Sequence, residues 1–432
     1  MSVPDPSIRT NRRIFYTRVA TFVGVFVLAW SFSHTLHRMP TMPTPRPPSP
    51  NAFDDYKRAS GAMKHVEECD VLYTEWSRTT APALTVAQIA QADRIVAANS
   101  RAFGDIQRGL THQYSAPQSY GFDILTPYLA HYRMLSYLLA IKSSSLAAHG
   151  DSSGAISAAI DAIQLGVQIP CGGNLMSGLV GYSCQQTGQR AARSVLDRIP
   201  APVAIAAARR LAAIDCAQVH FADILAGEER FGARSIEKML DQRREPREFV
   251  KAVRESDEYG NYALVMYLEP DDVIMGNYLD YMDLSVKHAR QSYKQWSHSP
   301  HVSLPRDPIN QVIVPQFDSA RLQFERATCN NRLLEIQLAL QSYRASHGRY
   351  PASLTAISPA IIPAVPEDPF ADSSSFRYRG TAKGNALYSV GPDGVDDRGK
   401  PIEQNDAQHK DRGRYAVTDP ALSGDYVAGI NY

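Results

Sequence analysis

The sequence predicts a mainly α-helical protein that begins with a transmembrane helix and ends in a small α+β domain. Three observations predict this class. An uncharged apolar run, 19–32, follows a basic N-terminal segment. Apolar residues then recur at helical spacing through much of the interval 51–297. Near the C-terminus they alternate instead, as in short strands. A chain of 432 residues is long enough for two such domains and an anchor.

Composition is that of an ordinary globular chain and argues against one class of function. Apolar residues make up 44% of the sequence and charged residues 21%, which is enough apolar material to bury a sizeable core. The 45 Lys and Arg residues nearly balance the 44 Asp and Glu residues, and no basic stripe is present. Nucleic-acid binders usually show a basic excess or a basic face. We therefore expect no nucleic-acid partner.

The N-terminal segment predicts a membrane anchor. Residues 1–18 carry four arginines, and the apolar run after them reaches the length of a bilayer core, about 30 Å, when it is extended over residues 14–36. The positive-inside rule then keeps residues 1–18 in the cytoplasm and puts the rest outside the bacterial cytoplasmic membrane. A signal peptide cleaved near Ser33 is the alternative, and it would also export the chain. A buried core helix is the non-membrane alternative.

A proline-rich linker separates this anchor from the folded part. Six of the twelve residues 39–50 are proline, which favours extended polyproline II and a semi-rigid spacer.

The interval 51–297 predicts an irregular array of helical hairpins. We expect helices over 54–78, over 85–110 with Thr85 as N-cap, around Tyr128–Leu139, and around Ile156–Val167 after a break at Gly150. Three more helices are expected over 174–198, 202–227 and 271–296. The Ala-rich pair on either side of Gly150 weakly resembles a tetratricopeptide hairpin.

A second proline-rich linker, 298–318, precedes the C-terminal domain, 319–402, and a polar tail follows over 403–432. The domain begins with a long helix that ends at Gly348 and carries a narrow apolar stripe. The stripe residues are Leu322, Cys329, Leu333, Ile336, Leu340 and Tyr343. A short helix over 352–361 and a hairpin of two half-buried strands follow, with its turn at 383–385.

Four motifs in this domain occur in the order typical of one family. They are Tyr343 to Tyr350-Pro351 around Gly348, the turn Pro366-Glu367-Asp368-Pro369, the pair Tyr378-Arg379, and the loop Tyr388 to Gly394. In this region the chain resembles the major pseudopilin of type II secretion systems, which implies a pilin-like fold. The chain as a whole is similar to uncharacterised membrane-anchored proteins of planctomycete-type bacteria.

The resemblance also implies a calcium site in the last loop. Asp393 is the best-matched ligand, with Asp396 and Asp397 as further ligands. Calcium prefers six to eight oxygen ligands, which carboxylates and loop carbonyls supply. The alternative is a solvated acidic turn whose charges are balanced by Arg398 or Lys400 without a metal.

No catalytic set is recognisable, and the five cysteines show no metal-binding spacing. Most are expected to be small buried apolar residues, although Cys171 and Cys184 could form a disulfide. We expect a structural or protein-interaction role with an envelope protein as partner. An accessory component of a type II secretion or pilus-like system is one alternative. An envelope hydrolase is another, and it would require His, Asp or Glu residues to meet in a cleft between the domains.

Overall fold

The computed structural model describes residues 46–78, 84–117, 126–243, 269–315, 317–372, 374–380, 384–402 and 423–429. The predicted cytoplasmic segment and the transmembrane anchor lie outside these residues, as do most of the first linker and most of the tail. Within the described part, none of the helices combines the length and the apolar character that a membrane span needs.

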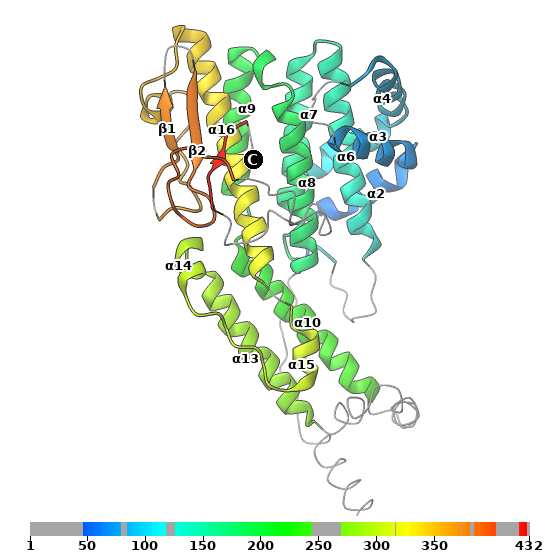
Figure 1. Ribbon diagram of the computed structural model, residues 1–432. Helices are drawn as coiled ribbons and strands as arrows, with labels where there is room; N and C mark the ends of the chain where they lie inside the picture. The colour runs from blue at the N-terminus through cyan, green and yellow to red at the C-terminus, as the bar shows by residue number, and fades with distance from the viewer. Residues whose placement is uncertain are drawn as a thin grey trace, which may run out of the picture.

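The described chain is mainly helical, with a three-stranded sheet at one side (Figure 1). The first nine helices, in chain order, are α2 (Ala52–Ala62), α3 (Val66–Arg78), α4 (Val86–Ala98), α5 (Ser100–Thr111), α6 (Pro127–Ala148), α7 (Ser152–Gln168), α8 (Leu175–Arg193), α9 (Ala201–Cys216) and α10 (Phe221–Arg243). They are followed by α13 (Asp271–Ala289), α14 (Tyr293–His298), α15 (Pro308–Ile313) and α16 (Asp318–His347). The strands are β1 (Arg377–Gly380), β2 (Asn385–Ser389) and β3 (Tyr426–Val427).

The first two predicted helices are each divided in two, so those bounds were wrong. Thr85 does cap α4 as expected, in a capping box with Gln88. However, buried Asn99 separates α4 from α5. Its side-chain amide donates to the carbonyls of Lys64 and Ile95, and its Oδ1 accepts from the Lys64 N–H at 2.8 Å. These bonds join the turn between α2 and α3 to the turn between α4 and α5. Apolar spacing in the sequence does not encode this tertiary contact.

The later bounds differ in the same way. The predicted helix 202–227 is α9 and α10, and the predicted helix 271–296 is α13 and α14. The short helix expected over 352–361 is only the 3-10 turn η2 (Leu354–Ile357). The predicted second linker contains α15, which begins after Asp307 because the Asp307 carboxylate accepts from the Asn310 N–H at 2.8 Å.

Helices α6, α7 and α8 lie side by side and form the middle of the array (Figure 1). Helices α7 and α8 approach each other closely at Gly166 and Gly181. A Cβ atom on Gly166 would lie 2.5 Å from the Gly181 carbonyl oxygen, and a Cβ on Gly181 would meet the Gly166 oxygen at the same distance. Only glycine therefore allows the two backbones to pack this closely.

A second, smaller core lies at the far end of the molecule, where α10, α13 and α15 extend away from the array (Figure 1). Its buried side chains include Ile236, Ile274, Tyr278 and Phe317. The N-terminal end of α16 joins this core through Ala320, so one long helix connects the two cores.

Helix α16 is the central element, and the narrow apolar stripe predicted for it was wrong. It lies between α8 and α9 on one side and the sheet on the other (Figure 1). Residues on most of its faces are buried, including Leu334, Leu338 and the polar pair Asn330 and Asn331. The helix ends at Gly348, whose φ of 69° is left-handed, as the sequence predicts.

Buried amide side chains fix how α16 lies on α8. Gln189 donates to Asn331 Oδ1 at 2.7 Å, and Asn331 donates to Gln185 Oε1 at 2.8 Å. Because a buried amide is stable only with its partners, a shift of α16 by one residue would leave these groups unpaired. The interface therefore has one favoured register.

The sheet has the order β1–β2–β3, with both pairs antiparallel. The predicted hairpin of β1 and β2 is confirmed, with Tyr378 opposite Leu387. The expectation of half-buried strands is wrong for β2, because consecutive residues from Leu387 to Val390 are all buried. One face packs towards α16, and β3 from the C-terminal tail extends the sheet beside β2.

Candidate functional site

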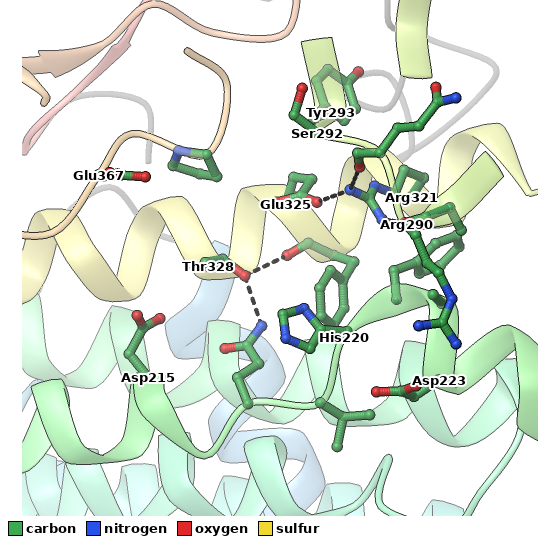
Figure 2. A pocket seen from close by; sticks show the side chains of 18 of the residues that line it. Asp215, His220, Asp223, Arg290, Ser292, Tyr293, Arg321, Glu325, Thr328 and Glu367 are labelled. Atoms are coloured by element: carbon green, nitrogen blue, oxygen red, sulfur yellow. Dashed lines mark hydrogen bonds and ion pairs between the residues drawn. The ribbon is translucent and has the colours of Figure 1, made fainter. Parts of the chain in front are cut away.

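A cavity with charged walls lies where four parts of the chain meet. These parts are the α9–α10 turn, the α13–α14 turn, α16 and the loop 367–371 before the sheet. Its volume is about 560 Å³, within the range of typical ligand sites. Figure 2 shows His220 and Thr328 near its middle, with Asp215 on one side and Asp223 on the other. We call this space the polar cavity.

A buried ion pair on α16 forms one wall of the polar cavity. Arg321 and Glu325 lie one helical turn apart, and their side chains approach to 2.6 Å (Figure 2). Arg321 also donates to the Ala289 carbonyl at 2.9 Å, which ties α16 to the end of α13. Burial raises the pKa of Glu325, although the positive charges of Arg321 and Arg332 oppose that shift.

Arg332 organises the opposite wall. Its Nε donates to Asp215 Oδ2 at 2.9 Å and its Nη1 donates to the Glu367 carbonyl at 2.8 Å. This one guanidinium therefore joins α9, α16 and the loop that leads to the sheet. The second carboxylate oxygen, Asp215 Oδ1, is buried and has no hydrogen-bond partner among the described residues.

Gln218 presents a second unpaired acceptor. Its Nε2 donates to Thr328 Oγ1 at 2.7 Å, while its Oε1 is buried and lacks a partner within the described chain. Buried polar atoms are rarely left without a hydrogen bond. Asp215 and Gln218 both line the polar cavity, and each keeps one acceptor that is shielded from solvent and unpaired within the described chain.

The residue types that the hydrolase alternative requires do meet here, but not as a catalytic set. The hydroxyls of Ser292 and Thr328 donate to the Asp372 carboxylate and to the Phe324 carbonyl. Neither is hydrogen-bonded to His220 in the described structure. A nucleophile that is activated by a general base needs that bond.

The three predicted calcium ligands lie in one loop beside β2, but each carboxylate is already used by the protein. Asp396 forms an ion pair with Arg377 at 3.2 Å and accepts from the Tyr388 hydroxyl at 3.1 Å. Asp393 accepts from the Val395 N–H, and Asp397 accepts from the Ser423 hydroxyl. No three acidic, His or Cys side chains are gathered as metal ligands among the residues that the structure describes. A cation at this loop would therefore compete with the contacts that these carboxylates make within the protein.

Sequence reasoning missed Asp425, which enters the same loop from the tail. It is fully buried, and its two carboxylate oxygens accept from the N–H groups of Gly399 at 2.6 Å and Asp397 at 3.4 Å. Burial raises the pKa of Asp425 to about 6, and the negative charges of Asp396 and Asp397 add to the shift against those two hydrogen bonds. Asp425 is far from this loop in sequence, and no sequence pattern indicated that it would enter the loop.

Asp368, in the predicted Pro366–Pro369 turn, has a structural role that the motif did not reveal. Its carboxylate accepts from the Ser389 hydroxyl at 2.7 Å, from the Val390 N–H at 3.1 Å and from the Phe370 N–H at 3.0 Å. Asp368 therefore fastens the turn to the end of β2 and places Glu367 at the cavity wall.

All five cysteines are free, so the Cys171–Cys184 disulfide that the sequence allowed does not form. The expectation of burial is right for Cys69, Cys184 and Cys329. Cys216 is exposed at the end of α9, next in sequence to Asp215 of the polar cavity.

Comparisons with family models, with curated proteins and with solved structures find no match to this chain. Functional interpretation therefore depends on the sequence motifs and on the geometry of the polar cavity.

Proposed function

We propose that the chain is a membrane-anchored, extracytoplasmic interaction protein, and that its polar cavity receives a segment of an envelope protein partner. The observation that carries this proposal is the cavity itself. It has the volume of a binding site, paired charges in its walls, and two unpaired acceptors, Asp215 Oδ1 and Gln218 Oε1. A polypeptide segment offers backbone N–H donors and C=O acceptors to polar walls of this kind.

Two finer proposals concern the parts that frame the cavity. We infer a weakly tetratricopeptide-like array in α6–α8 because successive antiparallel helices pack against each other there. We infer a pseudopilin-like C-terminal domain because α16 ends at Gly348 and packs on the β1–β2 hairpin. Since most faces of α16 are already buried, the arrangement gives little support to assembly of this helix into a pseudopilus. An accessory role at a secretion system is the second candidate.

Calcium binding remains part of the proposal. Asp393, Asp396 and Asp397 share one loop with buried Asp425, and the concentration of negative charge there favours a cation. For a calcium ion to bind, Asp396 must leave Arg377.

Exposed Cys216 allows location and binding to be tested together. A membrane-impermeant maleimide that carries a photo-crosslinker is added to spheroplasts that express the full chain. We expect it to modify Cys216, because this thiol is exposed and would lie outside the membrane; it follows the cavity residue Asp215 in sequence. We then expect illumination to produce one discrete crosslinked envelope protein.

Two variants serve as controls. Cys216→Ser should lose both the modification and the product. In that background Leu284→Cys, on the exposed face of α13, should be modified but should give no product. Modification of Cys216 only after lysis would contradict the proposed location. If the maleimide attached at position 216 and the maleimide attached at position 284 give the same crosslinked products, binding at the cavity would be contradicted.

A further inference from the structure

A second, smaller cavity lies beside the polar cavity and has a different character. It is lined by the first turns of α10, the second half of α13, α14, the loop 301–304 and the start of α16. Its volume is about 280 Å³, slightly below the lower limit of about 300 Å³ for most ligand sites, so it suits a small ligand. Four aromatic side chains contribute to its walls, namely Phe221, Tyr281, Trp296 and Phe317. We call this space the aromatic pocket.

One of these rings already holds a cation. Phe221 lines both cavities, and the Arg321 guanidinium lies over its ring at 5.3 Å from the centre. The face of an aromatic ring attracts a positive charge within about 6 Å of its centre, and Trp attracts it most strongly. In the part of the chain that the structure describes, neither Lys nor Arg lies over Tyr281, Trp296 or Phe317. These three rings therefore have no cation of the protein's own.

The ionisable groups at the pocket favour a positively charged ligand. Neither Lys nor Arg is among the described residues that line it, and its one acidic side chain is the half-exposed Asp318. His301 lies 3.5 Å from this carboxylate and balances its charge only when the imidazole is protonated. Burial lowers the pKa of His288, and the positive charges of His301 and Arg321 add to this effect, while Asp318 opposes it, so the His288 imidazole is neutral at neutral pH. Arg321 itself is already paired with Glu325.

The pocket suits a quaternary ammonium group better than a primary one. A primary ammonium carries three N–H donors, and each needs an acceptor when it leaves water. The Ser285 hydroxyl already donates to the Tyr281 carbonyl at 2.8 Å, and the Asp318 carboxylate is shared with His301. A trimethylammonium group has no donor to satisfy, and its methyl groups match the aromatic and apolar walls.

We propose that the aromatic pocket binds a small quaternary ammonium compound, whose trimethylammonium group packs against Tyr281, Trp296 and Phe317 with the Asp318 carboxylate as its counter-charge. Aromatic rings that surround a quaternary ammonium replace its weakly held water with electrostatic attraction. This site is separate from the polar cavity, so the inference goes beyond the proposed function and does not depend on the partner proposed there.

The test compares choline with 3,3-dimethylbutan-1-ol, in which carbon replaces the nitrogen, so that the two probes differ in charge but hardly in shape. Each is titrated by calorimetry into the full chain in a maltoside detergent at pH about 8, where imidazoles of ordinary pKa are neutral. We expect choline to bind about tenfold more tightly, because contacts with two or three rings favour the charged probe. We also expect choline to change the tryptophan emission of the wild type but not of Trp296→Phe.

Three variants locate the binding. Asp318→Asn keeps the shape of a half-exposed side chain and removes its charge, so choline should bind about two- to fivefold more weakly while the alcohol is unaffected. Asp283→Asn is the matched control and should change nothing, since Asp283 is similarly exposed on α13 but lies outside the pocket. Trp296→Phe keeps an aromatic ring of weaker cation affinity and should weaken choline about two- to threefold.

Several results would overturn the proposal. Equal binding of choline and the alcohol would show that charge plays no part, and no binding of either would remove the site. Choline binding that Asp318→Asn and Asp283→Asn weaken alike would place the ligand outside the pocket. N-acetyl-lysinamide bound more tightly than choline would overturn the quaternary assignment in favour of a primary ammonium.

Phosphocholine, the headgroup of a choline lipid, separates two sources of the same chemical group. Binding as tight as that of choline supports a lipid headgroup as the ligand. Binding about tenfold weaker supports a free quaternary ammonium compound, because the phosphate then meets the Asp318 charge. The Cys216 crosslink is independent of both results, so the proposed function and this binding site can fail separately.

Discussion

The two halves of α16 show how one helix can serve both architecture and binding. Residues 333–347 carry Leu333, Leu334 and Leu338, which are fully buried between the helical array and the sheet. Residues 318–332 instead carry Arg321 and Glu325, which line the polar cavity. The first half is buried as far as Ser342, mainly by apolar packing, whereas the second combines buried apolar side chains such as Leu322 with paired charges.

The difference lies in what each half needs from its surroundings. An apolar side chain is stabilised by any close-packed neighbour. A buried charge is stable only when a specific partner is in place, as Arg321 is for Glu325. The half that forms the cavity wall therefore depends on its partners on α9, α13 and the loop 367–371. The apolar half packs against the array and the sheet and so fixes the positions of those partners.

The largest expected loss of stability comes from a substitution in the apolar half of α16. Leu338→Ala removes a fully buried side chain of the main core and should lower the free energy of unfolding by about 3 kcal/mol. Thr328→Val in the cavity half leaves the Gln218 amide without its acceptor and should cost only about 1 kcal/mol. Denaturant unfolding of the full chain measures both. Equal losses would remove the distinction between the two halves.

The second prediction concerns the one acidic residue buried within the apolar half. Burial raises the pKa of Glu335 to about 8, and the charge of Asp215 adds to the shift while Arg332 opposes it. The unfolded value is about 4.3, so between these two pH values the folded chain binds more protons than the unfolded chain. The contribution of Glu335 to stability is therefore complete below pH about 4.3 and is lost as the pH rises through about 8.

Glu335→Gln keeps the shape of this side chain and removes its titration. At pH about 9 it should be more stable than the wild type by on the order of 2 kcal/mol, and at pH about 4 the two should be equally stable. Unfolding free energies across this range give the result. Parallel pH curves for the two proteins would show that Glu335 does not titrate as its burial implies.

The smallest expected effect tests calcium at the loop beside β2. Thermal melting of the full chain is measured with calcium and with chelator. The free energy of unfolding should be higher with calcium by about 1 kcal/mol or less, since binding to the native state stabilises it. Asp393→Ala should abolish the difference. Arg377→Gln should increase it, because Asp396 is then released from its ion pair. A melting temperature that is unchanged by calcium in both the wild type and Arg377→Gln would remove the calcium proposal.

Sequence reasoning succeeded where neighbouring residues decide the structure. The cap at Thr85, the end of α16 at Gly348 and the hairpin of β1 and β2 each follow from a few adjacent residues. It failed where a distant partner decides. Asn99 interrupts a helical pattern because it bonds to Lys64, and Asp425 enters the acidic loop from the tail. The candidate site depends on such pairs throughout, and the sequence did not predict its polar cavity.

The sequence by itself determined the mainly helical class, the C-terminal hairpin and most helix starts, because backbone propensity and apolar spacing are local properties. Only the tertiary structure decided that α16 is buried on most faces and that Asp215, Arg332 and Glu367 meet at one cavity. These residues are far apart in sequence, and their meeting depends on how whole helices pack. Local spacing carries no information about that packing.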